Sequence, residues 1–138
     1  MNIFDVVNEL SVLCVTLLMM AVSTIWYSSW MFGNIWMRET SSTEQSLLTS
    51  PFEMFRKTAL TFVSYFTITL SVAYILAVAP QLHLPLHTVT LTIFAFTVAV
   101  LAPISIWEQK SLRYFLISIG FMGVFIVASV YILTSWPW

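Results

Sequence analysis

The stretch LSVLCVTLLMMAVSTIWYSSWMF, residues 10–32, carries no charged side chain and decides the fold class of this 138-residue chain. An α-helix needs about 20 apolar residues to cross the hydrocarbon core of a bilayer. Three further stretches, at about residues 58–79, 86–107 and 114–136, approach that length and also lack charge. We therefore predict an all-α integral membrane protein, a four-helix bundle of two hairpins that forms one domain over residues 1–138.

The composition indicates contact with lipid rather than with water. Hydrophobic residues make up 59% of the chain and charged residues 8%, whereas about a quarter of the residues in a typical soluble domain are charged. A domain of this size exposes a large part of its surface, and so few charged side chains cannot cover it. Membrane lipid is therefore the first predicted partner. The net charge of −1 provides no basic field, so nucleic acid is not a predicted partner.

The basic residues predict how the chain is oriented in the membrane. All five lie in two of the connections between the predicted spans: Arg38, Arg56, Lys57, Lys110 and Arg113. Connections that are rich in Lys and Arg face the cytoplasm. We therefore expect an inner loop over residues 38–57 and both termini on the outer (periplasmic or extracellular) side of the cell inner (plasma) membrane.

The inner loop contains the pattern of a helix start. Ser50 supplies a hydroxyl acceptor, Pro51 suits the first helical position, and Glu53 is the acidic residue three positions after the cap. The second helix is therefore predicted to begin near Pro51, below the membrane, and to end near Ala79. A second cap, at Ser42, predicts a short surface helix within the same loop.

Small residues at four-residue spacing indicate faces on which the helices can pack. Ala73 and Ala77 form such a pair in the second span, and Ala95 and Ala99 form one in the third. Membrane helices associate through close packing of small residues, because lipid is as apolar as leucine. Two interpretations stay open: packing within one chain, or a contact between two copies. Cys14, the only cysteine, is predicted to be a buried and inert thiol.

The segment WYSSWMFGNIWM, residues 26–37, resembles the signature of the bacterial family catalogued as domain of unknown function 1761. In that family the first membrane helix ends in Trp-Tyr-Ser-Pro, followed by Phe-Gly-Lys and then Trp-Met. Ser29 stands here in place of the proline, and Asn34 in place of the lysine. The resemblance extends over nearly the whole chain. It implies a small four-span membrane protein and supplies no activity.

The same segment supplies the first candidate site. Its residues could shape a pocket for a lipid head group or a small ligand, and the candidates are Trp26, Tyr27, Ser28, Phe32, Gly33, Trp36 and Met37. The competing interpretation is anchoring of the chain, because amphipathic rings favour the head-group level of a bilayer.

Ionisable residues near the ends of the predicted spans form the second candidate site. Asp5 and Glu9 share one helix face and, with Glu108, are candidates for taking up a proton or a cation. The simpler interpretation places the first two at a helix start, where the helix dipole favours acids, and Glu108 in an interfacial ion pair. His83 and His87 are separated by a proline, so we expect solvated loop residues. No metal and no cofactor is predicted.

The sequence shows no glycine-rich phosphate loop and no spacing typical of a catalytic triad, so an enzyme is not predicted. The leading hypothesis is a non-enzymatic membrane protein that forms an oligomer or serves as an accessory subunit of a larger membrane complex. One alternative is an oligomeric transporter or channel for ions, protons or small molecules. Another is a membrane subunit that binds pigment or haem through His83 or His87.

Overall fold

The structure, a computed structural model, describes residues 7–40 and 50–137, and these residues form helices joined by short connections. In chain order, the elements are α1 (Glu9–Trp26), α2 (Gly33–Glu39), α4 (Pro51–Val78), the short 3₁₀ helix η2 (Ala79–Leu82), α5 (Leu86–Trp107) and α6 (Leu112–Ser135). The prediction of an all-α chain is confirmed for these residues. Within residues 7–40 and 50–137, four helices are long and apolar enough to cross a membrane: α1, α4 together with η2, α5 and α6.

Helix α1 is shorter than the predicted first span, which was expected to run to Phe32. It begins after Asn8, whose side-chain oxygen accepts a hydrogen bond from the Ser11 amide at 3.2 Å. It ends at Trp26, because the Phe32 amide turns back to donate to the Trp26 carbonyl at 3.1 Å. The chain therefore makes a compact turn before α2, and the prediction of one continuous helix to Phe32 is wrong.

Helix α4 begins at the residue that its cap predicted. The Ser50 hydroxyl accepts a hydrogen bond from the Glu53 amide at 3.4 Å, and Pro51 is the first helical residue. The helix has 28 residues, which corresponds to about 42 Å at 1.5 Å per residue. The α-helix ends at Val78, and η2 takes the chain through the predicted end at Ala79. The surface helix predicted from Ser42 lies outside the described residues.

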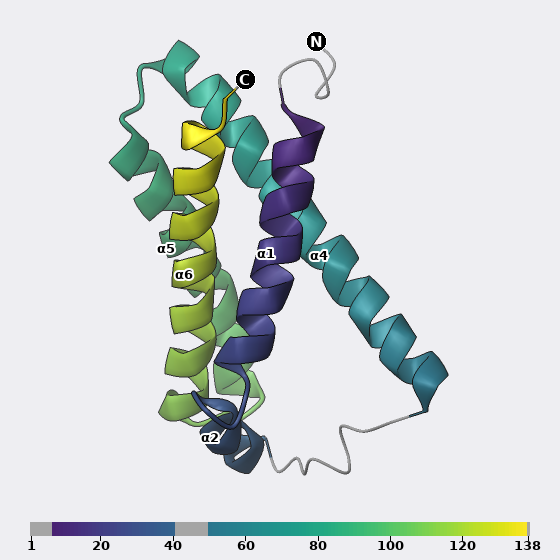
Figure 1. Cartoon of the computed structure of the whole chain (residues 1–138). Coiled ribbons are helices and arrows are strands. Elements are labelled where there is room, and N and C mark those ends of the chain that lie inside the picture. The colour runs from purple at the N-terminus through teal and green to yellow at the C-terminus, as the bar shows by residue number, and fades with distance from the viewer. Residues whose placement is uncertain (1–6, 41–49, 138) are drawn as a thin grey trace.

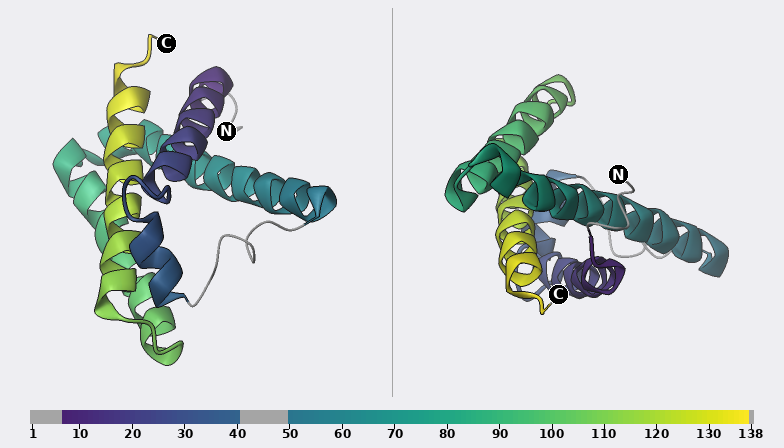
Figure 2. Two further views of the ribbon diagram at one scale, coloured as in Figure 1. Left: turned by 60° about the horizontal axis from the view of Figure 1, so that its bottom comes forward. Right: turned by 90° about the horizontal axis from the view of Figure 1, so that it is seen from above.

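The helices are arranged around α6, which contacts α1, α2, α4 and α5 (Figures 1 and 2). Helix α5 lies along α6 and touches α4 only sparsely. Helix α4 crosses the other helices obliquely, and its first half diverges from them (Figure 1). The start of α1, the η2 connection and the end of α6 lie at one end of the molecule, whereas α2 and the α5–α6 turn lie at the other (Figure 1).

The core forms where α1, α4 and α6 meet. Its fully buried large side chains are Met19, Val12, Val15, Val72, Phe125, Ile126 and Leu133. Four hydroxyl side chains are buried with them: Ser11, Thr16, Thr69 and Ser129. Thr16 donates to the Val12 carbonyl at 2.7 Å, whereas the hydroxyls of Thr69 and Ser129 have no hydrogen-bond partner among the described residues.

Two predictions about small side chains are corrected by this arrangement. Cys14, which was expected to be buried, is exposed, because it lies on the face of α1 that points away from the core. The pair Ala95 and Ala99 is also exposed, since α5 uses another face to contact α6, whereas Ala73 on α4 is buried in the core. Of the two predicted packing stripes, only the one on α4 is used within the chain.

Candidate functional site

The aromatic segment predicted as a pocket folds into the turn between α1 and α2 and packs against α6. Trp26 donates from its indole nitrogen to the Ile117 carbonyl of α6 at 3.3 Å. Its ring lies 4.7 Å from that of Phe32 and 6.1 Å from that of Phe121, between centroids. The indole is therefore held on three sides, and its N–H is used inside the chain.

Tyr27 occupies the next position of this cluster. Its ring makes an edge contact with Trp36 at 5.7 Å and lies at the same distance from Phe121. Burial raises the pKa of Tyr27 to about 12, and the neighbouring Tyr65 adds a smaller contribution in the same direction. A side-chain hydrogen bond with Ser118 opposes the shift. The Tyr27 phenol is therefore harder to deprotonate than that of an exposed tyrosine.

Gly33 explains why this turn needs a glycine. A Cβ atom at this position would overlap the Tyr27 carbonyl oxygen and lie 2.7 Å from the Ser28 carbonyl. The Gly33 amide donates to the same Ser28 carbonyl at 2.9 Å. At Gly120, a Cβ atom would approach the Trp26 ring to 3.2 Å, so the absence of a side chain lets the indole lie close to α6.

The seven residues predicted for this site are thus brought together, but as a packed cluster. Six of them are half-buried and Gly33 is buried. Ser28 donates from its hydroxyl to the Ile25 carbonyl at 2.6 Å. Rings from α4 and α6 fill the space beside the turn, and Tyr65 of α4 lies 6.0 Å from Phe121. The arrangement supports an anchoring role for the segment more than a pocket.

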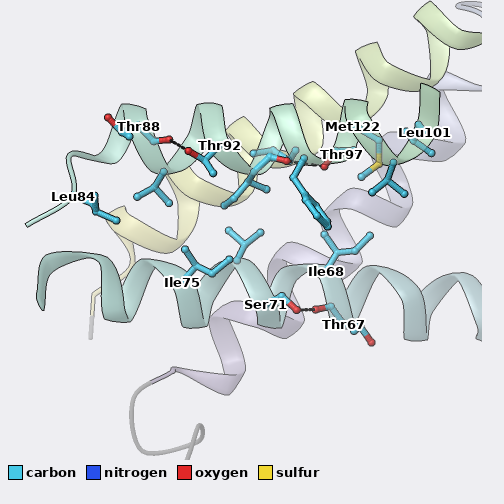
Figure 3. A pocket seen from close by; sticks show the side chains of 16 residues that line it. Thr67, Ile68, Ser71, Ile75, Leu84, Thr88, Thr92, Thr97, Leu101 and Met122 are labelled. Atoms are coloured by element: carbon cyan, nitrogen blue, oxygen red, sulfur yellow. Dashed lines mark hydrogen bonds between the residues drawn. The ribbon is translucent and has the colours of Figure 1, made fainter. Parts of the chain in front are cut away.

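A cavity lies elsewhere, between α4 and α5, with α6 as its floor (Figure 3). Its volume is about 820 Å³, near the upper end of the range for small-molecule sites, which is about 300–1,000 Å³. Figure 3 shows Ile68 and Ile75 of α4 on one wall, Thr92 and Thr97 of α5 on the other, and Met122 behind them. None of its sixteen lining residues is ionisable.

The hydroxyl groups in this cleft are largely occupied by their own helices. Ser71 donates to the Thr67 carbonyl at 2.8 Å, and Thr92 donates to the Thr88 carbonyl at 2.8 Å. Thr97 donates to the carbonyl one turn earlier at 2.9 Å. Such back-bonding consumes the only proton of a hydroxyl. The cleft therefore presents an almost apolar surface despite its several Ser and Thr residues.

The ionisable candidates are not gathered into a site. Glu9 is exposed in the first turn of α1, and Glu108 is exposed at the C-terminal cap of α5, near the opposite end of the molecule. Asp5 lies outside the described residues. His83 and His87 are both exposed. His83 lies in the connection after η2, as expected, whereas His87 lies in the first turn of α5 and not in a loop. Among the described residues, no group of three His, Cys, Asp or Glu side chains could hold a metal ion.

Comparison with known proteins agrees with the family resemblance noted in the sequence. The model of the family described as protein of unknown function (DUF1761) matches residues 10–134. The chain belongs to this family. No curated protein and no solved structure matches it.

Two residues of the aromatic segment, Ser29 and Asn34, depart from the DUF1761 signature described in the sequence analysis. Helix α1 ends at Trp26 although Ser29 replaces the proline, so hydrogen bonds and Gly33 are sufficient to end the helix. Asn34, which replaces the lysine, donates from its side-chain amide to the Ser29 carbonyl at 3.3 Å. The two departing positions thus contact each other and support the same turn.

The cleft was missed at the level of sequence. The repeating hydroxyl positions Thr67 and Ser71 mark one face of α4, but hydropathy does not tell whether that face meets a helix or lines a gap. The gap exists because α4 crosses obliquely and touches α5 sparsely. No signal in the sequence specifies that crossing.

Proposed function

We propose that this DUF1761 member is a small, non-enzymatic, multi-pass protein of the inner (plasma) membrane that works by assembling, with copies of itself or with a larger membrane complex. Its assembly surface is the diverging first half of α4. Its termini face outward, and its α2 end faces the cytoplasm. The orientation is supported by the five basic residues, which all lie in or next to the connections at that inner end: Arg38 of α2, Arg56 and Lys57 of α4, Lys110 of the α5–α6 turn and Arg113 of α6.

The observation that carries the proposal is that the described residues leave most of the first half of α4 unpacked. Phe52 and Phe55 are 75% and 72% exposed, and Val63, three turns inward from Pro51, is still 60% exposed. Helix α1 crosses α4 only near the core, so the two helices separate toward the inner end (Figure 1). We call the space between the separating parts of α1 and α4 the wedge. Helices in a membrane gain stability from close van der Waals packing, and a partner helix in the wedge would supply this packing.

Hydroxyl groups add a means of contact on the same part of α4. Thr61 and Ser64 already donate to their own helix, to Lys57 and Leu60. Their oxygen atoms keep lone pairs that can accept a hydrogen bond from a neighbouring helix. A partner with a hydroxyl or amide side chain at this depth would therefore be favoured over a purely aliphatic one.

Cysteine cross-linking in membranes tests this proposal. In a Cys14→Ser background, Val63→Cys places one thiol in the wedge, and Val127→Cys places one on α6 at nearly the same exposure, 60% against 59%. We expect efficient cross-linking from position 63, to a second copy or to another protein identified by mass, and little from position 127. Equal cross-linking at both positions, together with a strict monomer by light scattering in mild detergent, would contradict the proposal.

The described residues give no specific support to the alternatives of transport or pigment binding. The cleft has no ionisable lining, and Glu9 and Glu108 lie near opposite ends of the molecule. His83 and His87 are exposed, whereas an axial haem ligand points into the pocket that encloses the haem. These alternatives are therefore not proposed.

A further inference from the structure

We propose that the cleft between α4 and α5 binds the acyl chains of one zwitterionic membrane phospholipid. This site is separate from the assembly surface, because it lies on the side of α4 that faces α5, and it does not depend on assembly. Three properties of the cleft identify its occupant: its dimensions, the state of its hydroxyl groups and the absence of charge around it.

The dimensions of the cleft suit extended hydrocarbon chains. The lining on α5 extends from Thr88 to Leu101, which is roughly 20 Å along the helix axis. Over this length the cleft has a volume of about 820 Å³, which is within the range of small-molecule sites, about 300–1,000 Å³. The extended chains of a lipid can therefore lie along α5 inside it.

The length of the cleft also matches one leaflet. A hydrocarbon core is about 30 Å thick, so the chains of one lipid reach about 15 Å into it. The cleft ends at Leu84, in the connection between η2 and α5 (Figure 3). Gln81 and His83 are exposed in this connection and can donate hydrogen bonds to the oxygen atoms of a phosphodiester. A lipid of the outer leaflet would thus place its head group beside them and its chains along α5.

The cleft is poor in hydrogen-bond donors for a ligand. Ser71, Thr92 and Thr97 spend their protons on their own helices, so they offer no free donor to an occupant. Apolar chains need no such donor, whereas a polar ligand would leave its buried acceptors unpaired.

Charge complementarity selects the class of head group. Residues 58–107, which include the whole cleft apart from α6, contain no Asp, Glu, Lys or Arg. An anionic head group would find no cation from these residues, whereas all five basic residues lie outside them, in the inner connections. A head group with balanced charges, as in phosphatidylethanolamine, meets no unpaired charge there.

The test is lipid retention by the full chain. The protein is reconstituted into vesicles with equal amounts of phosphatidylethanolamine and phosphatidylglycerol, extracted into mild detergent and washed. Bound lipid is then identified by native mass spectrometry and counted as phosphorus. We expect roughly one phosphatidylethanolamine per chain, as for a ligand that nearly fills a preformed site.

The matched variants fill the cleft or leave it open. Ser71→Phe with Thr92→Phe places two rings in the lining and should abolish retention. Ala95→Phe adds a ring on the exposed face of α5, outside the lining, and should leave retention unchanged. Val100→Phe, a single change at a lining residue that is 46% exposed, should reduce retention and serves where the double variant does not fold.

Each contrary result overturns the proposal. Retention that is absent in the unmodified chain, or equal in Val100→Phe and Ala95→Phe when both melt like the unmodified protein, would show that the cleft is not the site. Enrichment of phosphatidylglycerol would contradict the charge argument. A phosphate-free apolar molecule in place of phospholipid would assign the cleft to another class of ligand. Loss of assembly in the cross-linking experiment would leave lipid retention unaffected.

Discussion

The two sides of α6 are packed in different ways. Toward α1 and α4, the side chains of Phe125 and Leu133 are fully buried and the neighbouring helices are in close contact. On the side that floors the gap between α4 and α5, Met122 and Ile126 line a cleft of about 820 Å³. The composition is apolar on both sides, so hydrophobicity alone does not decide which side closes. The angle at which the helices cross and the presence of interlocking aromatic rings decide which side closes.

The side of α6 that faces α1 and α4, here called the filled side, is specified by aromatic contacts between helices. Phe125 meets Tyr65 of α4 edge-on at 5.1 Å and meets Phe121 at 6.1 Å. In the cleft, by contrast, Phe96 of α5 is 70% exposed. Interlocking rings allow only one packing of α4 against α6, whereas the threonine and isoleucine side chains on the facing walls of the cleft leave room for a ligand.

The largest expected difference between the two sides comes from removing a ring. Phe125→Ala should lower the free energy of unfolding by about 3 kcal/mol, the lower end of the range for buried Phe in soluble cores, because lipid rather than water surrounds the unpacked helices. Phe96→Ala should cost less than about 0.5 kcal/mol, because its ring is exposed. Unfolding in mixed micelles, followed by circular dichroism, measures both. Equal losses would remove the distinction between filled and open sides.

A smaller effect is expected from adding a methyl group in the aromatic turn. Gly33→Ala should destabilise the chain by about 2 kcal/mol, as overpacking does, because its Cβ would overlap the Tyr27 carbonyl oxygen, a backbone atom. Gly123→Ala is the matched control on α6. There the Cβ atom would meet the edge of the Phe94 ring at 3.3 Å, and a side chain can shift where backbone cannot.

The melting temperatures of these two glycine variants decide whether the turn is as tight as the filled side. A Gly33→Ala protein that melts like the unmodified chain, or below it by no more than Gly123→Ala, would show that the turn is loose. The result would then favour a flexible hinge between α1 and α2 over a rigid anchor.

The same contrast explains what could be predicted from the sequence. Local signals were sufficient for α4, where the Ser50 cap and Pro51 fix the first residue. Helix α5 runs from Leu86 to Trp107, the residues of the predicted third span, because Pro85 and Glu108 bound an apolar stretch. Such features depend on neighbours in the chain, and a sequence displays them directly.

Features that depend on contacts between distant residues were not predicted. The end of α1 at Trp26 has no proline or charge to mark it, and the seat of the Trp26 indole on α6 depends on the Ile117 carbonyl, 91 residues away. The exposure of Cys14 and the cleft depend on how α4 crosses its neighbours. The aromatic candidates lie in one region because they are close in sequence, but their packing around Gly33 depends on the backbone geometry of the turn.

The hydrogen bond of Trp26 gives a smaller test of the filled side. Trp26→Phe keeps a ring against Phe121 but removes the donor to the Ile117 carbonyl. We expect a loss of about 1 kcal/mol, the net value of one hydrogen bond, measured by the same unfolding assay. Trp30→Phe is the control, since Trp30 is 94% exposed and should tolerate the change. A loss of stability in Trp30→Phe equal to that in Trp26→Phe would argue against a specific role for the indole N–H.

The smallest expected effect has the opposite sign and concerns a flaw within the filled side. Thr69 is fully buried and its hydroxyl has no partner among the described residues. Thr69→Val keeps the shape and removes the unpaired group, so it should raise stability by up to about 1 kcal/mol. Thr16→Val is the control, because its hydroxyl donates to the Val12 carbonyl at 2.7 Å, and its effect should stay within about 0.5 kcal/mol. If Thr69→Val lowered stability instead, the hydroxyl would have a partner in the membrane, such as a bound water or a helix of a second copy, and the filled side would be a contact surface as well.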